Sequence, residues 1–486
     1  MPDGWWWVGT LAAGPLTVVA VSLSPVRAER LRYVSIAAAS VLLVAALILV
    51  AGTDRTRLAT GILILEGTDL LRIDTLSIAL LPLAAALWLL TVAVTPRSAL
   101  GRDGLRRTAI ATLLTFASFL TRNPVFLLLL WVGSVWTFLH ALGNHAQGRP
   151  RRIVTAYLGA STLLLAVGVA LMSWPAVDGT SVETTGLWLI VMAALIRKGI
   201  VPFHAWVPEV FDQGRLGPAV LFSAPQVGAY VTAVLVVPQA SPEVLRLVAV
   251  LALVTAVYGA ALALVQTSAR RACGYLFVSQ SALVMAGLDC TSASALAGGL
   301  VLWLSSGLAF AGLARTVLVL EARRGRMDLS RYHGGYQRMP VLAISFLVMG
   351  LACTGFPGTL AFAGQEMLVA GAVEDFPVLG FAVVLASALT GLAVVRMYFA
   401  LFCGRPEAAT DPSVHLALRR SETWSFATVV VLLVGFGLFP RLVVDSRFAA
   451  SEELLRARQY RSNLADDAAA ADEARRPAGA GRRLPR

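Results

Sequence analysis

The sequence predicts an all-α membrane protein, a polytopic bundle of about 14 transmembrane helices. Hydrophobic residues make up 57% of its 486 residues and charged residues 14%. The mean hydropathy is +0.75, and these values exclude an ordinary soluble domain. A transmembrane helix needs roughly 20 mostly apolar residues. Runs of this kind are centred near residues 13, 42, 85, 114, 134, 164, 193, 228, 255, 281, 305, 350, 390 and 431.

The arginine-rich loops predict the orientation in the membrane. A net charge of +12 would suggest a nucleic-acid partner for a soluble protein, but in a membrane protein basic loops stay in the cytoplasm. We therefore expect no nucleic-acid partner, a cytoplasmic location for the basic loops, and an N-terminus outside. The basic tail conflicts with this scheme, because it falls outside after an even number of spans. The basic loops are 24–32, 95–107, 148–152, 267–271 and 321–338, and the loops without basic residues are 174–185, 238–243 and 289–292.

Two apolar segments are interrupted by proline and glycine. They are "KGIVPFHAWVP" at 198–208 and "TGFPGTLAFAGQE" at 354–366. Interrupted segments at corresponding positions of two halves indicate an inverted-repeat transporter, because a broken helix frees backbone groups that then line a polar cavity. The alternative is that each segment only kinks an ordinary membrane helix.

Lys198, in the first interrupted segment, is the only lysine in a sequence that holds 40 lysine and arginine residues together. Arginine keeps its proton in proteins, whereas a desolvated lysine can release it near neutral pH. We therefore expect Lys198 to take part in a proton relay. The alternative is a side chain that extends to the membrane surface beside Arg197, a task that arginine performs equally well.

Two further residues are candidates for the relay. His204 lies in the same interrupted segment as Lys198, and an imidazole titrates near neutral pH. The alternative for His204 is a packed or interfacial side chain beside Trp206. Glu366 lies beside the second interruption and is a candidate exit carboxylate. The alternative for Glu366 is a residue of a loop in water.

Three other charges have structural interpretations. Asp74 opens an apolar run, where the helix dipole favours a carboxylate. Arg396 lies near the end of a run and is expected to extend to the membrane surface. Arg315 lies deep in its run, where a charge is usually paired, and the sequence does not name its partner. The four cysteines show no C-x-x-C spacing, and we expect no metal, haem, iron–sulfur or flavin cofactor.

Five segments in order resemble the antiporter-like membrane subunits of respiratory complex I. This family is shared with multisubunit Na⁺/H⁺ antiporters, membrane hydrogenases and inorganic carbon pumps. "RKGIVPFHAWVPEVFDQG" at 197–214 is similar to the family's lysine-then-P-F-H-x-W-x-P segment, and "GFPGTLAFAGQE" at 355–366 to its G-x-P-G-x-x-x-F break. The other three segments are "LRIDTLSIALL" at 71–81, "RRACGYLFVSQSALVMAGL" at 270–288 and "VVRMYFALFCG" at 394–404.

The resemblance implies a fold and a division of the chain. The fold has two inverted five-helix repeats, each with a broken helix and a half-channel. Residues 1–104 would be N-terminal transmembrane helices, 105–405 a proton-conducting antiporter-like region of two repeats, and 406–442 a C-terminal transmembrane helix. For 443–486 the composition predicts a basic, disordered tail. Lys198 takes the position of the first-half lysine in the family's proton relay.

Several relay positions depart from the family pattern. The glutamate of its W-E-G is Val132 here, and the histidine of its L-H-A-A-T-M-V falls on Phe222. Its exit lysine or glutamate falls on Gln365, next to Glu366. The segment 302–312, at the second-half H-A-x-x-K pair, holds no ionisable residue. Lys198 therefore lacks its usual carboxylate partner and needs another acid.

The function that the resemblance implies is proton translocation by a non-catalytic subunit of the cell (inner) membrane. Its partners would be the lipid bilayer, other membrane subunits and a soluble redox module. A first alternative is the membrane subunit of an inorganic carbon pump, with a carbonic-anhydrase-like soluble partner. A second is a non-conducting scaffold, which the missing relay positions favour.

Overall fold

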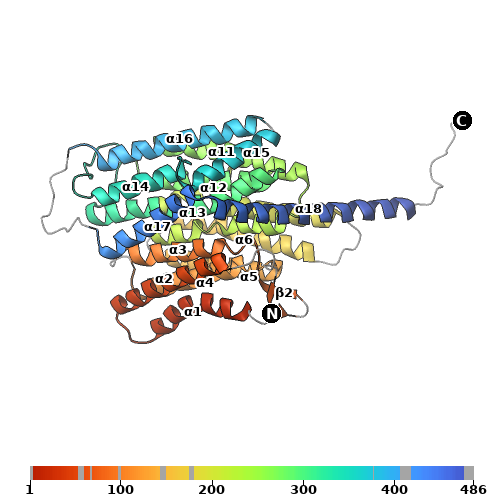
Figure 1. Ribbon diagram of the computed structural model, residues 1–486, viewed down its shortest axis with the longest axis horizontal. Coiled ribbons are helices and arrows are strands. Elements are labelled where there is room, and N and C mark those ends of the chain that lie inside the picture. Colours follow the sequence, from red (N-terminus) through yellow and green to blue (C-terminus); the bar gives the residue numbers. More distant parts are fainter. Residues whose placement is uncertain are drawn as a thin grey trace.

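The protein is a bundle of helices that lie side by side with roughly aligned axes (Figure 1). The computed structural model describes residues 4–52, 60–65, 68–96, 100–142, 149–173, 180–375, 377–405 and 418–475. The predicted all-α class is confirmed, and each expected run centre lies within a helix. The described strands form one antiparallel hairpin, β1 (Thr60–Leu65) with β2 (Thr68–Ile73).

The helices of the first half lead to the first interruption and the span after it. They are α1 (Gly4–Leu23), α2 (Ala28–Gly52), α3 (Leu80–Val94), α4 (Arg102–Phe119), α5 (Pro124–Leu142), α6 (Arg149–Ser173), α7 (Thr180–Lys198) and α8 (Trp206–Gln213). The next span is built from α9 (Leu216–Ser223), α10 (Val227–Val231) and the π-helix η3 (Thr232–Val236).

The second half contains the second interruption and the C-terminal helices. These are α11 (Pro242–Val265), α12 (Ala269–Asp289), α13 (Ala293–Arg324), α14 (Pro340–Cys353), α15 (Leu360–Asp375), α16 (Pro377–Phe402), α17 (Arg420–Leu438) and α18 (Arg441–Arg475). The C-terminal transmembrane helix expected within 406–442 is α17, and residues 406–417 lie outside the described part of the chain.

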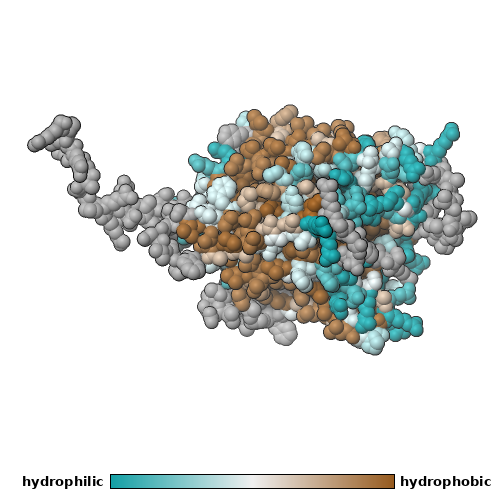
Figure 2. Space-filling view, turned by 180° about the vertical axis from the view of Figure 1, so that it is seen from behind, coloured by the Kyte–Doolittle hydropathy of each residue, from teal (hydrophilic) through white to brown (hydrophobic). Residues whose placement is uncertain are grey.

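The protein is a multi-pass membrane protein. Nine helices of the described residues are long and apolar enough to cross a membrane, and three shorter apolar helices accompany them. Figure 2 shows a broad apolar band with hydrophilic residues gathered at one end. The most apolar stretches of α12 and α13 are fully buried within the protein, whereas those of α2, α5 and α6 are only one-third buried. Helices α12 and α13 therefore form the centre of the bundle.

The two interruptions have the same backbone construction. Helix α7 ends before Gly199 and α14 ends just before Gly355, and both glycines have φ of +71°. In each case the glycine amide donates to the carbonyl three residues earlier, and the following amide donates to the carbonyl five residues earlier. This is the Schellman pattern, in which glycine adopts the left-handed conformation that ends a helix. The expected pair of broken helices is present.

The C-terminal end differs from the expected disordered tail at 443–486. Residues 441–475 form the single helix α18, and 476–486 lie outside the described residues. The start of α18 is held against the bundle, because the buried Arg447 guanidinium donates to the carbonyls of Thr75 at 2.5 Å and Leu76 at 3.0 Å. The far end projects beyond the other helices (Figure 1). Composition predicts only a short helix that fades into disorder beyond residue 455, and the longer helix could not be predicted because partners far earlier in the chain hold its start.

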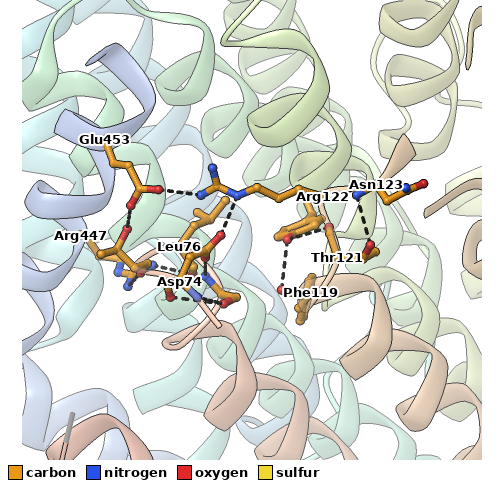
Figure 3. Close-up of polar contacts among 11 residues, drawn as sticks. Asp74, Leu76, Phe119, Thr121, Arg122, Asn123, Arg447 and Glu453 are labelled. Atoms are coloured by element: carbon orange, nitrogen blue, oxygen red, sulfur yellow. Dashed lines mark hydrogen bonds and ion pairs between the residues drawn. The ribbon is translucent and has the colours of Figure 1, made fainter. Parts of the chain in front are cut away.

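An ion-pair network completes this attachment. Arg122, just after α4, donates to Asp74 at 2.7 Å and to Glu453 of α18 at 2.9 Å. The Glu453 carboxylate also accepts a hydrogen bond from the Thr75 hydroxyl at 2.5 Å (Figure 3). Asp74 accepts a further bond from the Ser77 amide at 2.7 Å, in the turn that precedes α3. Asp74 thus lies in a turn six residues before α3, whose N-cap is Ala79, and not at the helix N-terminus.

Candidate functional site

Lys198 is the last residue of α7 and is 2% exposed, which excludes the alternative that it extends to the membrane surface. Its ammonium group donates a hydrogen bond to Oε1 of Gln226, the residue before α10. A Cβ on Gly228 would lie 2.9 Å from Cγ of Lys198. The absence of a side chain at Gly228 therefore makes room for the lysine stem.

Asp289 is the acid that accompanies Lys198. It is the last residue of α12 and is 1% exposed. Within the part of the chain that the structure describes, neither carboxylate oxygen has a hydrogen-bond partner. No hydrogen bond or ion pair joins Asp289 directly to Lys198 in the described residues, but the two groups are near enough for each charge to influence the other. The same helix also supplies the Ser281 hydroxyl, which donates to the Lys198 carbonyl at 3.2 Å.

Asp289 is not among the residues that the sequence predicts for the relay, because residues 289–292 are interpreted as an outside loop. The family's acid falls on Val132, which in the structure is 43% exposed on α5. The signal that was available is an aspartate that directly ends an apolar run, "SALVMAGLD". A charge at that place is costly in a membrane and is usually functional or paired.

Arg197 is a second buried cation beside Lys198. It is 6% exposed, and its Nη2 donates to the Ser134 hydroxyl at 2.8 Å. The guanidinium carbon lies 4.1 Å from the ring centroid of Trp131 and 4.3 Å from that of Phe222. Aromatic faces attract cations, and the attraction grows when water is excluded. Arg197 is thus held by π faces and one hydroxyl.

His204 lies in the turn between α7 and α8 and is partly buried. Its ring centroid lies 5.2 Å from that of Tyr258 in an edge-to-face arrangement and 6.4 Å from that of Tyr275. In the described residues its buried Nδ1 has no hydrogen-bond partner. The imidazole therefore has a nitrogen available for a proton, in a setting that also fits the packed alternative.

Glu366 lies on the helix α15 and not in a loop, and its side chain is exposed. Its neighbour Gln365 is buried and donates to the Ser387 hydroxyl at 2.8 Å. The neutral amide thus points into the bundle, and the carboxylate points out of it. An exposed carboxylate on a helix of a membrane bundle needs a polar neighbour.

Arg315 of α13 is fully buried and is bound by neutral oxygen atoms. It donates to the hydroxyls of Thr95 at 2.8 Å and Thr91 at 2.9 Å, and to the Gly217 carbonyl at 2.8 Å. The expectation that a deep charge has partners is met by hydroxyls and a carbonyl, which join α13 to α3 and α9.

Arg396 of α16 does not extend to the membrane surface as expected. It donates to the carbonyls of Leu264 at 2.5 Å and Gln266 at 2.9 Å, at the end of α11. The last carbonyls of a helix lack partners within the helix and carry partial negative charge. Arg396 therefore caps α11. Across the described ranges, the structure holds no group of three His, Cys, Asp or Glu residues that could bind a metal ion.

Comparison with known proteins identifies the family. The model of the transmembrane region described as NADH:quinone oxidoreductase/Mrp antiporter matches residues 152–390. These residues include Lys198, both interruptions and Asp289. Residues 152–390 of this chain belong to the family of antiporter-like membrane subunits. The two interruptions and the buried lysine of this antiporter-like subunit thus lie within the matched region.

Two relatives illustrate the similarity in sequence. NADH-quinone oxidoreductase subunit M of Pseudomonas aeruginosa is 29% identical over 63% of this chain and 66% of its own length. NADH-quinone oxidoreductase subunit 14 of Thermus thermophilus is 31% identical over 59% of this chain and 64% of its own length. The antiporter-like subunit therefore spans less than two thirds of either relative.

Solved structures show the same fold. A chain of the Mrp complex from Dietzia sp. DQ12-45-1b has a TM-score of 0.83 at 17% identity, with 95% of this chain and 99% of that chain covered. A chain of respiratory complex I from Thermus thermophilus with bound NADH has a TM-score of 0.81 at 21% identity, with 93% and 99% covered. None of these relatives or structures is named as an inorganic carbon pump, and the comparisons give that alternative no support.

Proposed function

We propose that this antiporter-like subunit translocates protons, with Lys198 and Asp289 as the central pair of its path. The observation that carries the proposal is a buried ammonium that is hydrogen-bonded to Gln226 beside the first helix interruption, in a bundle that also buries the carboxylate of Asp289, unpaired among the described residues. Asp289 would serve as the carboxylate of the relay, in place of the family's glutamate at the position of Val132. The fold and the family match support the class of function.

A proton transfer within this pair leaves the net charge of the buried groups unchanged. When the ammonium gives its proton to the carboxylate, both groups become neutral, and the cost of holding two charges in a dry interior is removed. When the proton is on Lys198, attraction between the charges and the bond to Gln226 compensate part of that cost. The two states can therefore lie close in free energy, as a relay requires.

We further propose that the relay belongs to a conducting region at 105–405 and that His204 and Glu366 extend it. His204 has a nitrogen without a described partner next to the first interruption. Glu366 faces away from the bundle, where another membrane subunit could provide the polar contact and receive the proton. The partners proposed are therefore other membrane subunits, with a soluble redox module coupled to the assembly.

Proton flux in vesicles that hold the complete assembly tests this function. Lys198→Ala and Asp289→Asn should each slow flux at least about tenfold, which corresponds to about 1.4 kcal/mol in the barrier. Lys198→Arg should also be slow, because arginine keeps its proton. The measurement is the quenching of a pH-sensitive dye. Glu452→Gln is the control, because this carboxylate lies 44% exposed in a surface pair on α18.

Parent-like flux in Lys198→Ala, Lys198→Arg and Asp289→Asn would contradict the relay and support the scaffold. The scaffold has an observation in its favour, because Val132, Phe222 and the segment 302–312 carry none of the usual ionisable groups. Gel filtration of each assembled variant separates a loss of conduction from a loss of assembly.

A further inference from the structure

A groove with a volume of about 460 Å³ lies between α11, α16 and the arginine-rich segment that follows α13. Two backbone bonds fix this segment. The Leu329 amide donates at 2.6 Å to a carbonyl two residues after α11, and the His333 amide donates at 2.9 Å to a carbonyl near the end of α16. Residues 330–332, between these two bonds, line the groove together with Arg396 of α16. The groove is therefore held open by the fold, beside a membrane helix and a basic loop.

Arg396 supplies the positive charge of the groove. Only its Nη1 is used to cap α11, through the carbonyls of Leu264 and Gln266. Its Nε and Nη2 donate to no described residue and are not buried. These two nitrogens form one edge of the guanidinium, and such an edge binds the two oxygens of a phosphate through parallel hydrogen bonds. Among the described residues that line the groove there is no aspartate or glutamate to occupy it.

The other polar residues of the groove contribute less. The Ser330 hydroxyl already donates to Asp328 at 2.7 Å. Arg331 lines the groove as well, but it lies near enough to the Asp328 carboxylate for the two charges to influence each other. The binding argument therefore depends on the free edge of Arg396.

One face of α16 gives the groove an apolar wall. Leu392, Val395 and Phe399 line the groove and are all exposed. Their spacing of three and four residues places them on one side of the helix, and α16 is apolar and long enough to cross a membrane. A phosphate-binding edge thus lies beside a hydrocarbon surface, an arrangement that fits an amphipathic ligand.

We propose that this groove binds one phospholipid with an anionic headgroup, from the leaflet that contacts the basic loops. The phosphate would lie against Nε and Nη2 of Arg396, and an acyl chain would lie along the exposed face of α16. The adjoining segment 321–338 is one of the basic loops expected in the cytoplasm, and the cytoplasmic leaflet is the one rich in anionic lipids. A soluble phosphate would leave the apolar wall uncovered. Lipid binding does not depend on proton conduction, so this proposal and the proposed function can fail separately.

Native mass spectrometry of the purified, delipidated full-length chain in detergent tests the site. The probe is dioleoyl phosphatidylglycerol, and the dissociation constant of the first bound molecule is measured. Dioleoyl phosphatidylcholine has no net charge and should bind about fivefold more weakly, the effect of one arginine on an anionic lipid. Glycerophosphoglycerol, the same headgroup without acyl chains, should not displace the lipid at about 10 mM.

Two variants locate the binding in the groove. Arg396→Gln keeps an amide for the carbonyls of α11 and removes the charged edge, so the affinity for phosphatidylglycerol should fall at least about tenfold. Its control is Arg456→Gln, which changes an exposed arginine on α18. Phe399→Ala keeps Arg396 and removes part of the apolar wall, so the affinity should fall about threefold to tenfold. Its control is Phe381→Ala, an exposed phenylalanine nearer the start of the same helix, which should bind as the parent does.

Three results would overturn the proposal. They are equal phosphatidylglycerol binding by Arg396→Gln and Arg456→Gln, equal binding by Phe399→Ala and Phe381→Ala, and displacement of the lipid by glycerophosphoglycerol, which would indicate a site for a soluble phosphate. If Arg396→Gln does not fold, because the cap of α11 is weakened, the two phenylalanine variants decide the outcome.

Discussion

At the scale of single residues, three buried cations are accommodated in three different ways. Lys198 interacts with the carboxylate of Asp289, Arg197 lies against two aromatic faces, and Arg315 is bound by two hydroxyls and a carbonyl. Fixed neutral donors and acceptors suit a charge that never changes. Only the lysine is placed with an acid, and only the lysine can exchange its proton.

Gly228 gives a residue-scale prediction. A methyl group there would lie 2.9 Å from Cγ and 3.3 Å from Cδ of Lys198, so Gly228→Ala should push the lysine stem away from Gln226. We expect the protein to fold and proton flux to fall about tenfold, because proton transfer depends on sub-ångström placement. Gly435→Ala on α17 has nothing within 4 Å of the added methyl and serves as the control. Equal flux in the two variants would show that the position of the stem does not matter.

At the scale of elements, two helices end in the same backbone pattern, and one long helix follows at the C-terminal end of the bundle. The Schellman ends at Gly199 and Gly355 stop α7 and α14 within the bundle, and a short non-helical turn follows each of them. Helix α18 depends on a different kind of contact, since Arg122 links Asp74, directly after β2, to Glu453. Local sequence determines where α7 and α14 end, whereas residues far away in the chain determine where α18 is attached.

The attachment of α18 gives an element-scale prediction. Arg122→Ala would leave Asp74, 1% exposed, without its ionic partner and should destabilise the protein by about 3 kcal/mol. Arg456→Ala removes an exposed pair on the same helix, with side chains 76% and 44% exposed, and should change stability by less than about 1 kcal/mol. Thermal unfolding in detergent, with limited proteolysis of α18, measures both. Similar melting temperatures would mean that the network does not hold the helix.

At the scale of the whole molecule, hydrophilic residues gather at one end of the apolar band (Figure 2). The arginine-rich segment 321–338 and the acidic start of α11 belong to opposite groups of loops in the orientation predicted from charge. Glu366 is exposed on α15. Together these features describe a membrane-embedded protein with its hydrophilic residues gathered at one end.

The orientation gives a prediction for the whole molecule. In a Cys403→Ser background, which leaves three buried native cysteines, single cysteines replace Ser330 and Glu243, both exposed. A membrane-impermeant maleimide should label Ser330→Cys only in inside-out vesicles and Glu243→Cys only in right-side-out vesicles. The reverse pattern would mean that the protein is inserted with its basic loops outside.

The sequence alone determined the fold class and the position of the site. Long apolar runs can only be satisfied as helices in lipid, so the helical bundle followed from composition. The glycine and proline signals marked both interruptions, because those residues act locally, and the single lysine marked the first. The sequence could not show which of the other charged residues are buried and paired, since a residue's type does not show which way its side chain points.

The tertiary structure alone decided the partners. Asp289 lies some ninety positions after Lys198 in the chain, and only the packing of α7 against α12 and α10 brings the two charges together. Other tertiary contacts leave Glu366 exposed on α15, make Arg396 a cap of α11 and hold the start of α18 against the bundle. Electrostatic pairing depends on distance in space, which one sequence does not contain. The family and the lysine could therefore be inferred from the residues, and the acid that completes the pair required the fold.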